Sequence, residues 1–317
     1  MSDPLAEVVA LLQPRALYSK VVAATRPWAV RRTRSDHPFY VVVLEGSCHL
    51  IIEERETITL HEGDFVLIPA ARPFATASLG NAAAAMDDAS LSPLAPVPGG
   101  VRVGDPAGAV DTRLLVGHCE FGSPDAALLV SLLPEFLVAR GQSRLATLVQ
   151  LVNDETRADR PARDVVLARL LEVLLIEALR SAACGAACGS ASPGLARGLG
   201  DPRLAAALRS LHARPMHGWT VGQLAQEAAL SRTTFFERFS RAVGVTPMDY
   251  LLAWRMALAS RLLREQDLPV AQVAERVGYS SASTFGAAFV RHVGMSPARY
   301  ARTARAQPAA GGEIRAT

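Results

Sequence analysis

Arginine side chains are concentrated in the carboxyl-terminal part of this 317-residue chain. Residues 201–317 contain 15 Arg against 8 Asp and Glu, a net charge of +7, whereas residues 1–200 contain 18 Lys and Arg against 22 Asp and Glu, a net charge of −4. Guanidinium groups bind phosphate oxygens, so the asymmetry indicates that the carboxyl-terminal part contacts a polyanion. Arg238, Arg241 and Arg291 are candidates for phosphate contacts, with solvated surface positions as the alternative.

Cysteines are the other residues whose type and spacing allow site chemistry. Cys184 and Cys188 have a spacing found in some metal and redox sites, but they lie among small residues with no histidine nearby, so we expect no site there. Four cysteines in this length do not form a disulfide framework and fit a reducing compartment. The chain shows neither a signal peptide nor an uninterrupted apolar run of membrane-spanning length. These features predict a cytoplasmic protein without a membrane partner.

An internal repeat supplies the elements that position the carboxyl-terminal arginines. An offset of 49 positions relates Val221, Leu224 and Ala225 to a second set, so the second copy has one additional residue in its turn. Such a repeat indicates that one supersecondary unit occurs twice. Further along, the offset is 50 positions, and Phe235, Phe239, Gly244, Pro247 and Tyr250 recur as Phe285, Phe289, Gly294, Pro297 and Tyr300.

The first copy has the pattern of two short helices joined by a tight turn. Thr220 is expected to N-cap a helix over 221–228, and Ser231 a second helix that Gly244 ends. Two such helices, with polar side chains on the second, form a helix-turn-helix unit that reads a major groove.

The second copy repeats this pattern. A helix over 270–277 leads through the turn 278–279 to a helix that begins at Ser280 or Ser281 and ends near Gly294. Between the copies, a largely apolar helix over 248–263 is expected to hold the two units at a fixed separation. If that separation is about 34 Å, one turn of DNA, both second helices enter successive major grooves.

The residues shared by the two copies form a specific pattern. They are Thr220-Val221-x-x-Leu224-Ala225, Ser231 to Phe239, Gly244-x-Thr246-Pro247-x-x-Tyr250, Val273-Ala274-x-x-Val277-Gly278-Tyr279, Phe285, Phe289 and Gly294-Met295-Ser296-Pro297-x-x-Tyr300. This pattern resembles the signature of AraC/XylS-type transcription regulators and covers roughly residues 201–303. The resemblance implies a sequence-specific regulator whose partners are double-stranded promoter DNA and, if it activates, RNA polymerase.

By this resemblance, the second helix of each copy presents its outward residues to the bases. Glu237 is suited to accept from a cytosine N4 amine, the Thr233 methyl to contact thymine, and Arg232 to bind guanine or phosphate. The second copy has small residues at these places, so we expect the first copy to carry most of the sequence reading. The complete predicted set is Arg232, Thr233, Phe236, Glu237 and Arg238 in the first copy, and Ser281, Ala282, Ser283, Gly286 and Arg291 in the second.

Aromatic residues of the carboxyl-terminal part are expected to be core rather than DNA contacts. A helix-turn-helix unit buries the face that carries Phe235 and Phe239, and likewise Phe285 and Phe289. The tryptophans Trp219 and Trp254 are interpreted as packing residues rather than as base-stacking platforms.

The amino-terminal part changes its hydrophobic period along its length. Short β-branched and aromatic runs at 39–44, 49–52, 65–68 and 113–121 indicate antiparallel strands, and residues 79–110 read as a long loop. Apolar residues at helical spacing then predict two amphipathic helices, Leu145 to Val152 and Val165 to Leu175, and the Gly-, Ala- and Ser-rich stretch 182–200 is the candidate linker.

The segment from Trp28 to Phe74, with Glu45-Gly46, Glu62-Gly63-Asp64 and Arg72-Pro73-Phe74, resembles the cupin-like sensor domain of a subset of these regulators. The resemblance extends over residues 4–180. We therefore expect an α+β protein of two domains. A cupin-like β-barrel with trailing helices covers 1–182, a linker covers 183–200, an all-α double helix-turn-helix domain covers 201–303, and a disordered tail covers 304–317.

A metal-binding cupin needs two histidines spaced by one residue, then a glutamate and a later histidine. This chain departs from that set, because His37 stands alone and Phe74 occupies the place of the late histidine. We expect no metal or other cofactor, and His37, His49 and His61 are interpreted as solvated or structural. Some regulators of this subset carry a cysteine directly before the glycine that corresponds to Gly117, but this chain has Val116 there and Cys119 three residues later. This departure disfavours a thiol-based oxidant sensor but leaves it as an alternative.

These observations predict a transcription regulator controlled by an unknown small-molecule effector or a chemical stress, with no enzymatic activity. Dimerisation through the helices between about 145 and 180 is part of this expectation. The alternatives are a cupin enzyme with an appended DNA-binding domain and an architectural DNA-binding protein without an effector. Protection of promoter DNA at low salt separates these classes.

Overall fold

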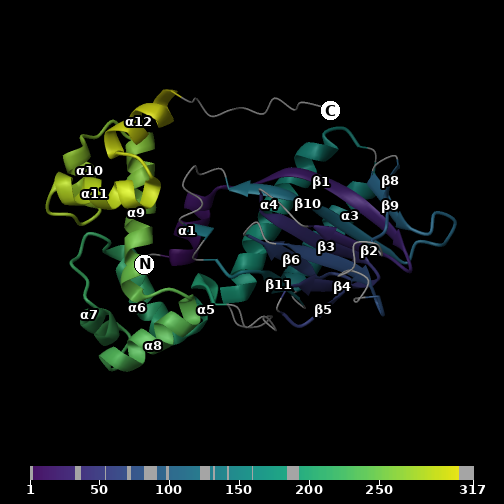
Figure 1. Ribbon diagram of the computed structural model, residues 1–317, viewed down its shortest axis with the longest axis horizontal. Coiled ribbons are helices and arrows are strands. Elements are labelled where there is room, and N and C mark those ends of the chain that lie inside the picture. Colours follow the sequence, from purple (N-terminus) through teal and green to yellow (C-terminus); the bar gives the residue numbers. More distant parts are fainter. Residues whose placement is uncertain are drawn as a thin grey trace. The chain divides into compact units, whose positions relative to one another are not determined.

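The computed structural model divides the chain into two compact units (Figure 1). One unit, here called the sheet unit, comprises Gln13–Gly122 and Leu133–Gly200. The other, the helical unit, comprises Met1–Leu12, Ser123–Leu132 and Asp201–Thr317. The structure describes residues 3–32, 37–53, 55–69, 73–81, 91–97, 100–121, 129–130, 133–140, 143–158, 160–183 and 193–306.

The sheet unit contains two sheets. The larger has seven strands in the order β11-β6-β3-β10-β1-β9-β8, and the smaller has four in the order β2-β7-β4-β5. Strand β1 pairs with β10 antiparallel and with β9 parallel. The strands are β1 (Pro14–Thr25), β2 (Ala29–Arg32), β3 (Phe39–Glu45), β4 (Ser47–Ile52), β5 (Ile58–His61), β6 (Phe65–Ile68), β7 (Phe74–Ser78), β8 (Leu94–Val97), β9 (Gly100–Gly104), β10 (Thr112–Phe121) and β11 (Leu137–Ala139).

The two sheets share one apolar core. Alternate residues of each strand point toward it, because side chains alternate across a strand. The core residues include Phe39, Val41 and Val43 of β3, Leu50 and Ile52 of β4, and Leu114 and Val116 of β10. The predicted strands at 39–44, 49–52, 65–68 and 113–121 are therefore confirmed as β3, β4, β6 and β10.

Helices cover the outer face of the larger sheet. The helix α3 (Ser143–Arg157) contacts β3, and α4 (Arg163–Ala183) contacts β1 and β11. The residues of β3 that point away from the shared core, Tyr40 and Val42, are consequently also buried. Burial on both faces explains why β3 is a continuous apolar run. The two predicted amphipathic helices are confirmed as α3 and α4.

Three parts of the sheet unit differ from the sequence-based expectation. The predicted loop 79–110 contains the hairpin β8–β9, which reaches the sheet through the parallel pairing of β9 with β1. A further strand, β11, precedes the predicted helices in a part of the chain where no strand was expected. The final part of the predicted linker is a short helix, α5 (Leu195–Gly200), and residues 184–192 lie outside the described part.

The helical unit contains the two predicted helix-turn-helix copies (Figure 1). The first is α7 (Val221–Glu227) with α8 (Arg232–Val243), and the second is α10 (Val270–Arg276) with α11 (Ala282–Val293). The helix α9 (Pro247–Glu265) connects them, and α1 (Pro4–Leu12), α6 (Pro202–Ala213) and α12 (Pro297–Ala306) complete the unit. Residues 304–306 of the predicted disordered tail, 304–317, are part of α12, and the remainder of that tail lies outside the described residues. No described helix is both long enough and apolar enough to span a bilayer.

Candidate nucleic-acid interface and sheet-unit cavity

The helix-turn-helix copies have the same internal packing. The rings of Phe235 and Phe239 are 5.5 Å apart at 49°, and those of Phe285 and Phe289 are 5.5 Å apart at 53°. Tyr250 packs edge-on against Phe239 at 5.8 Å, as Tyr300 does against Phe289 at 5.5 Å. All four phenylalanines are buried, so their predicted role as core is confirmed. The 50-residue repeat is a repeat of structure, and it fixes the inward face of α8 and of α11.

The helix ends also match between the copies. Ser231 caps α8 by accepting from the backbone N–H of Thr234, and Ser281 caps α11 by accepting from that of Thr284, both at 3.2 Å. Both helices end in a left-handed glycine, the second of them Gly294. Thr220 caps α7 in a capping box with Gln223, as the sequence predicts for its hydroxyl. Ser281, and not Ser280, is therefore the residue that caps α11.

The predicted base-reading residues of the first copy lie on the face of α8 that points away from Phe235 and Phe239 and is exposed to solvent. Arg232, Thr233, Phe236 and Glu237 are all exposed, and Phe236 is 42% exposed although it is aromatic. An ordinary solvated helix surface seldom exposes a phenylalanine ring. Here the Phe236 ring is exposed on the same helix as the Glu237 carboxylate and the Arg232 guanidinium. The face combines one hydrogen-bond acceptor, one cation and apolar groups, which together can discriminate base edges.

The corresponding face of α11 offers less chemistry. Ala282 and Ser283 are exposed, Gly286 is half-buried, and the hydroxyl of Ser281 is engaged in the cap. Val290, which is 45% exposed, adds an apolar side chain to the surface of this helix. The structure thus brings the same backbone to the surface in both copies but gives α8 the longer polar side chains.

The three predicted phosphate contacts differ in their surroundings. Arg238 forms an ion pair with Asp201, the residue that N-caps α6. Arg241 and Arg291 are exposed in the last turns of α8 and α11. The pairing of Arg238 could not be found from the sequence, because Asp201 lies outside the helix-turn-helix pattern and 37 residues away.

The connecting helix α9 carries a residue that joins the two copies. Arg255 donates from Nε to the carbonyl of Pro215 at 2.8 Å and from Nη2 to that of His217 at 2.9 Å, both just before α7. Its guanidinium also lies 5.9 Å from the ring centroid of Tyr279, in the turn of the second copy. One side chain thereby ties the entry to the first copy to the turn of the second. Sequence reasoning missed this residue, because Arg255 lies outside both repeated motifs.

Both tryptophans of the helical unit are packing residues, as predicted. Trp219 is buried, and its indole N–H donates to the carbonyl of Arg214 at 3.0 Å. Trp254 is buried in α9, 4.1 Å from the ring of His212. Neither is available for stacking on bases.

The sheet unit contains a cavity of about 220 Å³ between its two sheets. Most of its wall is apolar and comes from both sheets, including Val22, Val41 and Leu114 of the larger sheet and Val30 and Phe74 of the smaller. Phe74, which stands where a metal-binding cupin has its late histidine, is therefore part of an apolar wall.

One part of the cavity wall is cationic. Lys20, Arg32 and His118 line it from β1, β2 and β10, and Arg32 Nη2 lies 2.9 Å from His118 Nε2. Arg32 also lies 4.5 Å above the Phe39 ring. Burial, and next the positive charge of Arg32, lower the pKa of Lys20. Burial and then the same charge lower the pKa of His118, and burial lowers that of Arg32. His118 is therefore a neutral ring that accepts from Arg32, and an anion at this wall would favour the charged forms of Lys20 and Arg32.

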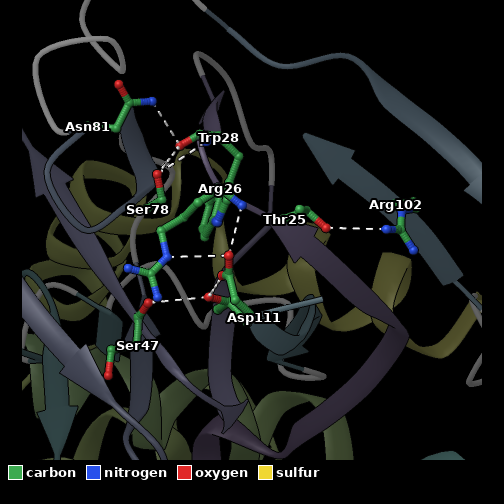
Figure 2. A network of polar contacts seen from close by, with 9 residues as sticks. Thr25, Arg26, Trp28, Ser47, Ser78, Asn81, Arg102 and Asp111 are labelled. Carbon is green, nitrogen blue, oxygen red and sulfur yellow. Dashed lines mark hydrogen bonds and ion pairs between the residues drawn. The ribbon is translucent and has the colours of Figure 1, made fainter. Parts of the chain in front are cut away.

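Trp28 is another wall residue, and a polar network fixes its backbone (Figure 2). Its N–H donates to Ser78 Oγ at 3.1 Å, and its carbonyl accepts from Asn81 Nδ2 at 3.2 Å. Just before it, the Arg26 N–H donates to Asp111 Oδ2 at 2.8 Å, and the Arg26 Nε lies 3.3 Å from the same oxygen. Burial opposes ionisation of Asp111, but the Arg26 N–H, the Thr112 hydroxyl and the Arg26 charge together lower its pKa. The network holds the turn that presents the Trp28 ring to the cavity.

The histidines that the sequence singles out have different neighbours in the described part of the chain. His49 lies 3.3 Å from Thr59 Oγ1, His61 lies 3.1 Å from Ser47 Oγ, and His37 stacks edge-on to His118 at 6.2 Å. Within the described ranges, no three His, Cys, Asp or Glu side chains could hold a metal ion together. Cys48 was not singled out by the sequence and is buried in the core, where burial raises its pKa to about 12. Cys184 and Cys188, and the side chain of Cys119, lie outside what the structure describes.

Comparison with known proteins gives matches to both parts of the chain. A cupin family model matches residues 3–184, and a helix-turn-helix domain model matches residues 224–303. A putative AraC-like transcription regulator of Streptomyces antibioticus is 34% identical over 94% of this chain and 98% of its own length. One of Streptomyces lividans is 35% identical over 94% of this chain and 97% of its own.

A more distant relative and a solved structure complete the comparison. The HTH-type transcriptional regulator AlkR of Acinetobacter baylyi is 30% identical over 86% of this chain and 90% of its own length. The crystal structure of the AdpA DNA-binding domain with a target DNA is 34% identical, covers 35% of this chain and 99% of its own, and has a TM-score of 0.33.

Proposed function

The chain belongs to the AraC-like transcription regulators that join an amino-terminal cupin domain to a carboxyl-terminal helix-turn-helix domain, and from this premise we propose that α8 reads promoter sequence while the sheet-unit cavity binds a small-molecule effector. DNA-binding regulation of transcription is the activity of this family, which is not a family of enzymes. The proposal concerns which residues read bases and what controls the reading.

The observation that carries the proposal is the exposed face of α8. Phe235 and Phe239 fix the inward side of this helix in the core, so Arg232, Thr233 and Glu237 point to solvent from a rigid support. Rigid presentation of polar side chains is what direct readout in a major groove needs. The exposed arginines, such as Arg241, would contact the phosphates beside the groove.

The test of base reading is substitution of Glu237 by alanine. A carboxylate that accepts from a cytosine amine predicts loss of discrimination at one base position, worth about 1–3 kcal/mol, with other positions unchanged. Binding to duplexes substituted at each position is measured by mobility shift. Glu265→Ala, an exposed glutamate of the connecting helix, is the matched control and should change nothing. A uniform loss across all positions, or no loss, contradicts the assignment of Glu237.

The surface of α3 and α4 supports a second part of the proposal, pairing with a second copy of the chain. Leu151, Val165, Val166 and Val173 on these helices are between 41% and 62% exposed. Large apolar side chains that gather on one exposed surface are typical of a protein interface. We expect a dimer by light scattering, and a monomer for the variant Val165→Glu with Val173→Glu. A wild-type protein that is monomeric at all concentrations contradicts this part.

A further inference from the structure

We propose that the sheet-unit cavity is selective for an organic anion, a molecule with a compact apolar body and one carboxylate, whose charged end lies at Lys20 and Arg32. This inference rests on the proposed function, in which the cavity holds the effector, and it adds the chemical class of that effector.

The volume and the lining of the cavity limit the size and chemistry of the ligand's apolar part. A dry cavity of roughly 150 Å³ lined by aliphatic and aromatic side chains holds benzene. The sheet-unit cavity, at about 220 Å³, has room for a substituted ring or a short chain. Its aliphatic and aromatic lining, for example Val22, Phe39, Phe74 and Leu114, favours burial of a hydrocarbon group over a polyhydroxylated one.

The position of the cations defines the charged end. Lys20 and Arg32 come from β1 and β2 and line the same cavity, close enough for the charge of Arg32 to act on Lys20. Arg32 is positioned by donating from Nη2 to Nε2 of the neutral His118 at 2.9 Å. Among the described residues, no carboxylate forms an ion pair with Lys20 or Arg32. Placing cations together in a partly buried site is costly without an anion, and a bound carboxylate supplies the missing charge. The planar guanidinium of Arg32 suits a carboxylate in particular.

An unsatisfied donor points to the same kind of ligand. Trp28 lines the cavity with its side chain fully buried, and its indole Nε1 has no hydrogen-bond acceptor within the described part of the chain. A buried donor without an acceptor is unfavourable, and most such donors are satisfied in proteins. The polar network of Figure 2 holds Trp28 in place, so the donor is fixed before a ligand binds.

Other ligand classes fit less well. A cationic ligand would meet Lys20 and Arg32, and the described lining contains no Asp or Glu to offset that repulsion. A sugar would need several hydrogen-bond partners, whereas Thr76 is the one hydroxyl among the described lining residues.

The test compares acids with their own amides on the full-length protein. Phenylacetate and hexanoate are titrated by calorimetry beside phenylacetamide and hexanamide, which keep the shape and lose the charge. We expect the acids to bind about tenfold to a hundredfold more tightly than the amides, because hydrogen bonds to charged groups are the stronger ones. Arg32→Met should remove this preference without weakening amide binding, and Arg32→Lys should restore part of it.

A matched control is Arg113→Met, because Arg113 lies on β10 outside the cavity and pairs with Glu45. This variant should keep the preference for acids, and circular dichroism confirms that each variant is folded. Equal binding of acids and amides overturns the inference but leaves an effector cavity in place. Binding of neither acids nor amides overturns both the inference and the effector part of the proposed function.

Discussion

Ala229 and Gly278 occupy the same place in the two helix-turn-helix turns, and both have a left-handed backbone, with φ of 50° and 84°. The second copy has glycine at this position, whereas the first copy has alanine, whose Cβ atom makes a left-handed backbone unfavourable. A left-handed conformation costs an ordinary residue roughly 1–2 kcal/mol. The alanine therefore stores strain in the unit that we expect to read most of the sequence.

Exchange at these two positions should change stability in opposite directions. Ala229→Gly should stabilise the protein by about 0.5–1 kcal/mol, because relief of the strain outweighs the added freedom of the unfolded chain. Gly278→Ala should destabilise it, because the new Cβ would lie 2.6 Å from Arg255 Nη2 and 2.9 Å from the Met216 carbonyl oxygen. Urea unfolding followed by circular dichroism measures both. A less stable Ala229→Gly protein would show that the turn is not strained.

The residues that line the cavity show what a sequence does not reveal at this scale. Lys20, Arg32 and His118 lie on three strands, and Arg32 and His118 are 86 residues apart in the chain. No short motif contains them, so they become a site only when β1, β2 and β10 are in place. The predicted reading residues of α8 were accessible from sequence, because they follow one cap, Ser231, on one helix.

Among the helices of the helical unit, a buried histidine connects α1 to α6 and α9. His212 on α6 lies with Nδ1 2.9 Å from Glu7 Oε2 of α1 and with Nε2 2.7 Å from the Tyr250 hydroxyl of α9. A neutral imidazole satisfies both contacts, by donating to the carboxylate and accepting from the hydroxyl. Burial lowers the pKa of His212 more than Glu7 and Asp3 raise it.

This contact predicts a pH dependence of stability with a definite sign. Because the pKa of His212 is lower in the folded than in the unfolded protein, the unfolded state binds the extra proton first. The stabilising contribution is complete above about pH 6.5, the usual histidine pKa, and is lost as pH falls through the folded value. Thermal unfolding between pH 7.5 and 5.5 should show this loss, and His212→Gln should show less of it. His118, whose pKa is also lowered, contributes with the same sign, so His118→Gln is the comparison. An unchanged pH slope in His212→Gln contradicts the assignment.

The elements differ in how far the sequence predicted them. Caps and breakers determine helix ends locally, so Thr220, Ser231 and Gly294 fall at their predicted places. The hairpin β8–β9 was missed because its sequence is rich in Pro, Gly and small residues, and its place comes from a parallel pairing with the distant β1. The strand β11 has three residues, too few to show a period of two.

In the whole molecule, the charge asymmetry agrees with the two roles that we propose, DNA binding by the carboxyl-terminal part and effector binding by the amino-terminal part. The carboxyl-terminal part, with its net charge of +7, carries the helices that we propose to face DNA. Its two reading helices share a backbone and a core but differ in their exposed side chains, since α8 has Arg232 and Glu237 where α11 has Ala282 and Ala287. We propose that the repeated backbone places two helices against DNA, and that their exposed side chains determine how strongly each helix discriminates between bases.

Selection of bound sequences from a randomised duplex pool tests this central claim most directly. We expect two clusters of preferred bases, roughly 10 bp apart because successive major grooves on one face are one helical turn apart. One cluster should be clearly stronger, and the Glu237→Ala protein should lose preference within that cluster alone. Two clusters of equal strength, or a Glu237→Ala effect in the weaker cluster, would contradict the unequal roles of α8 and α11. No enrichment over the pool would contradict sequence reading by this protein altogether.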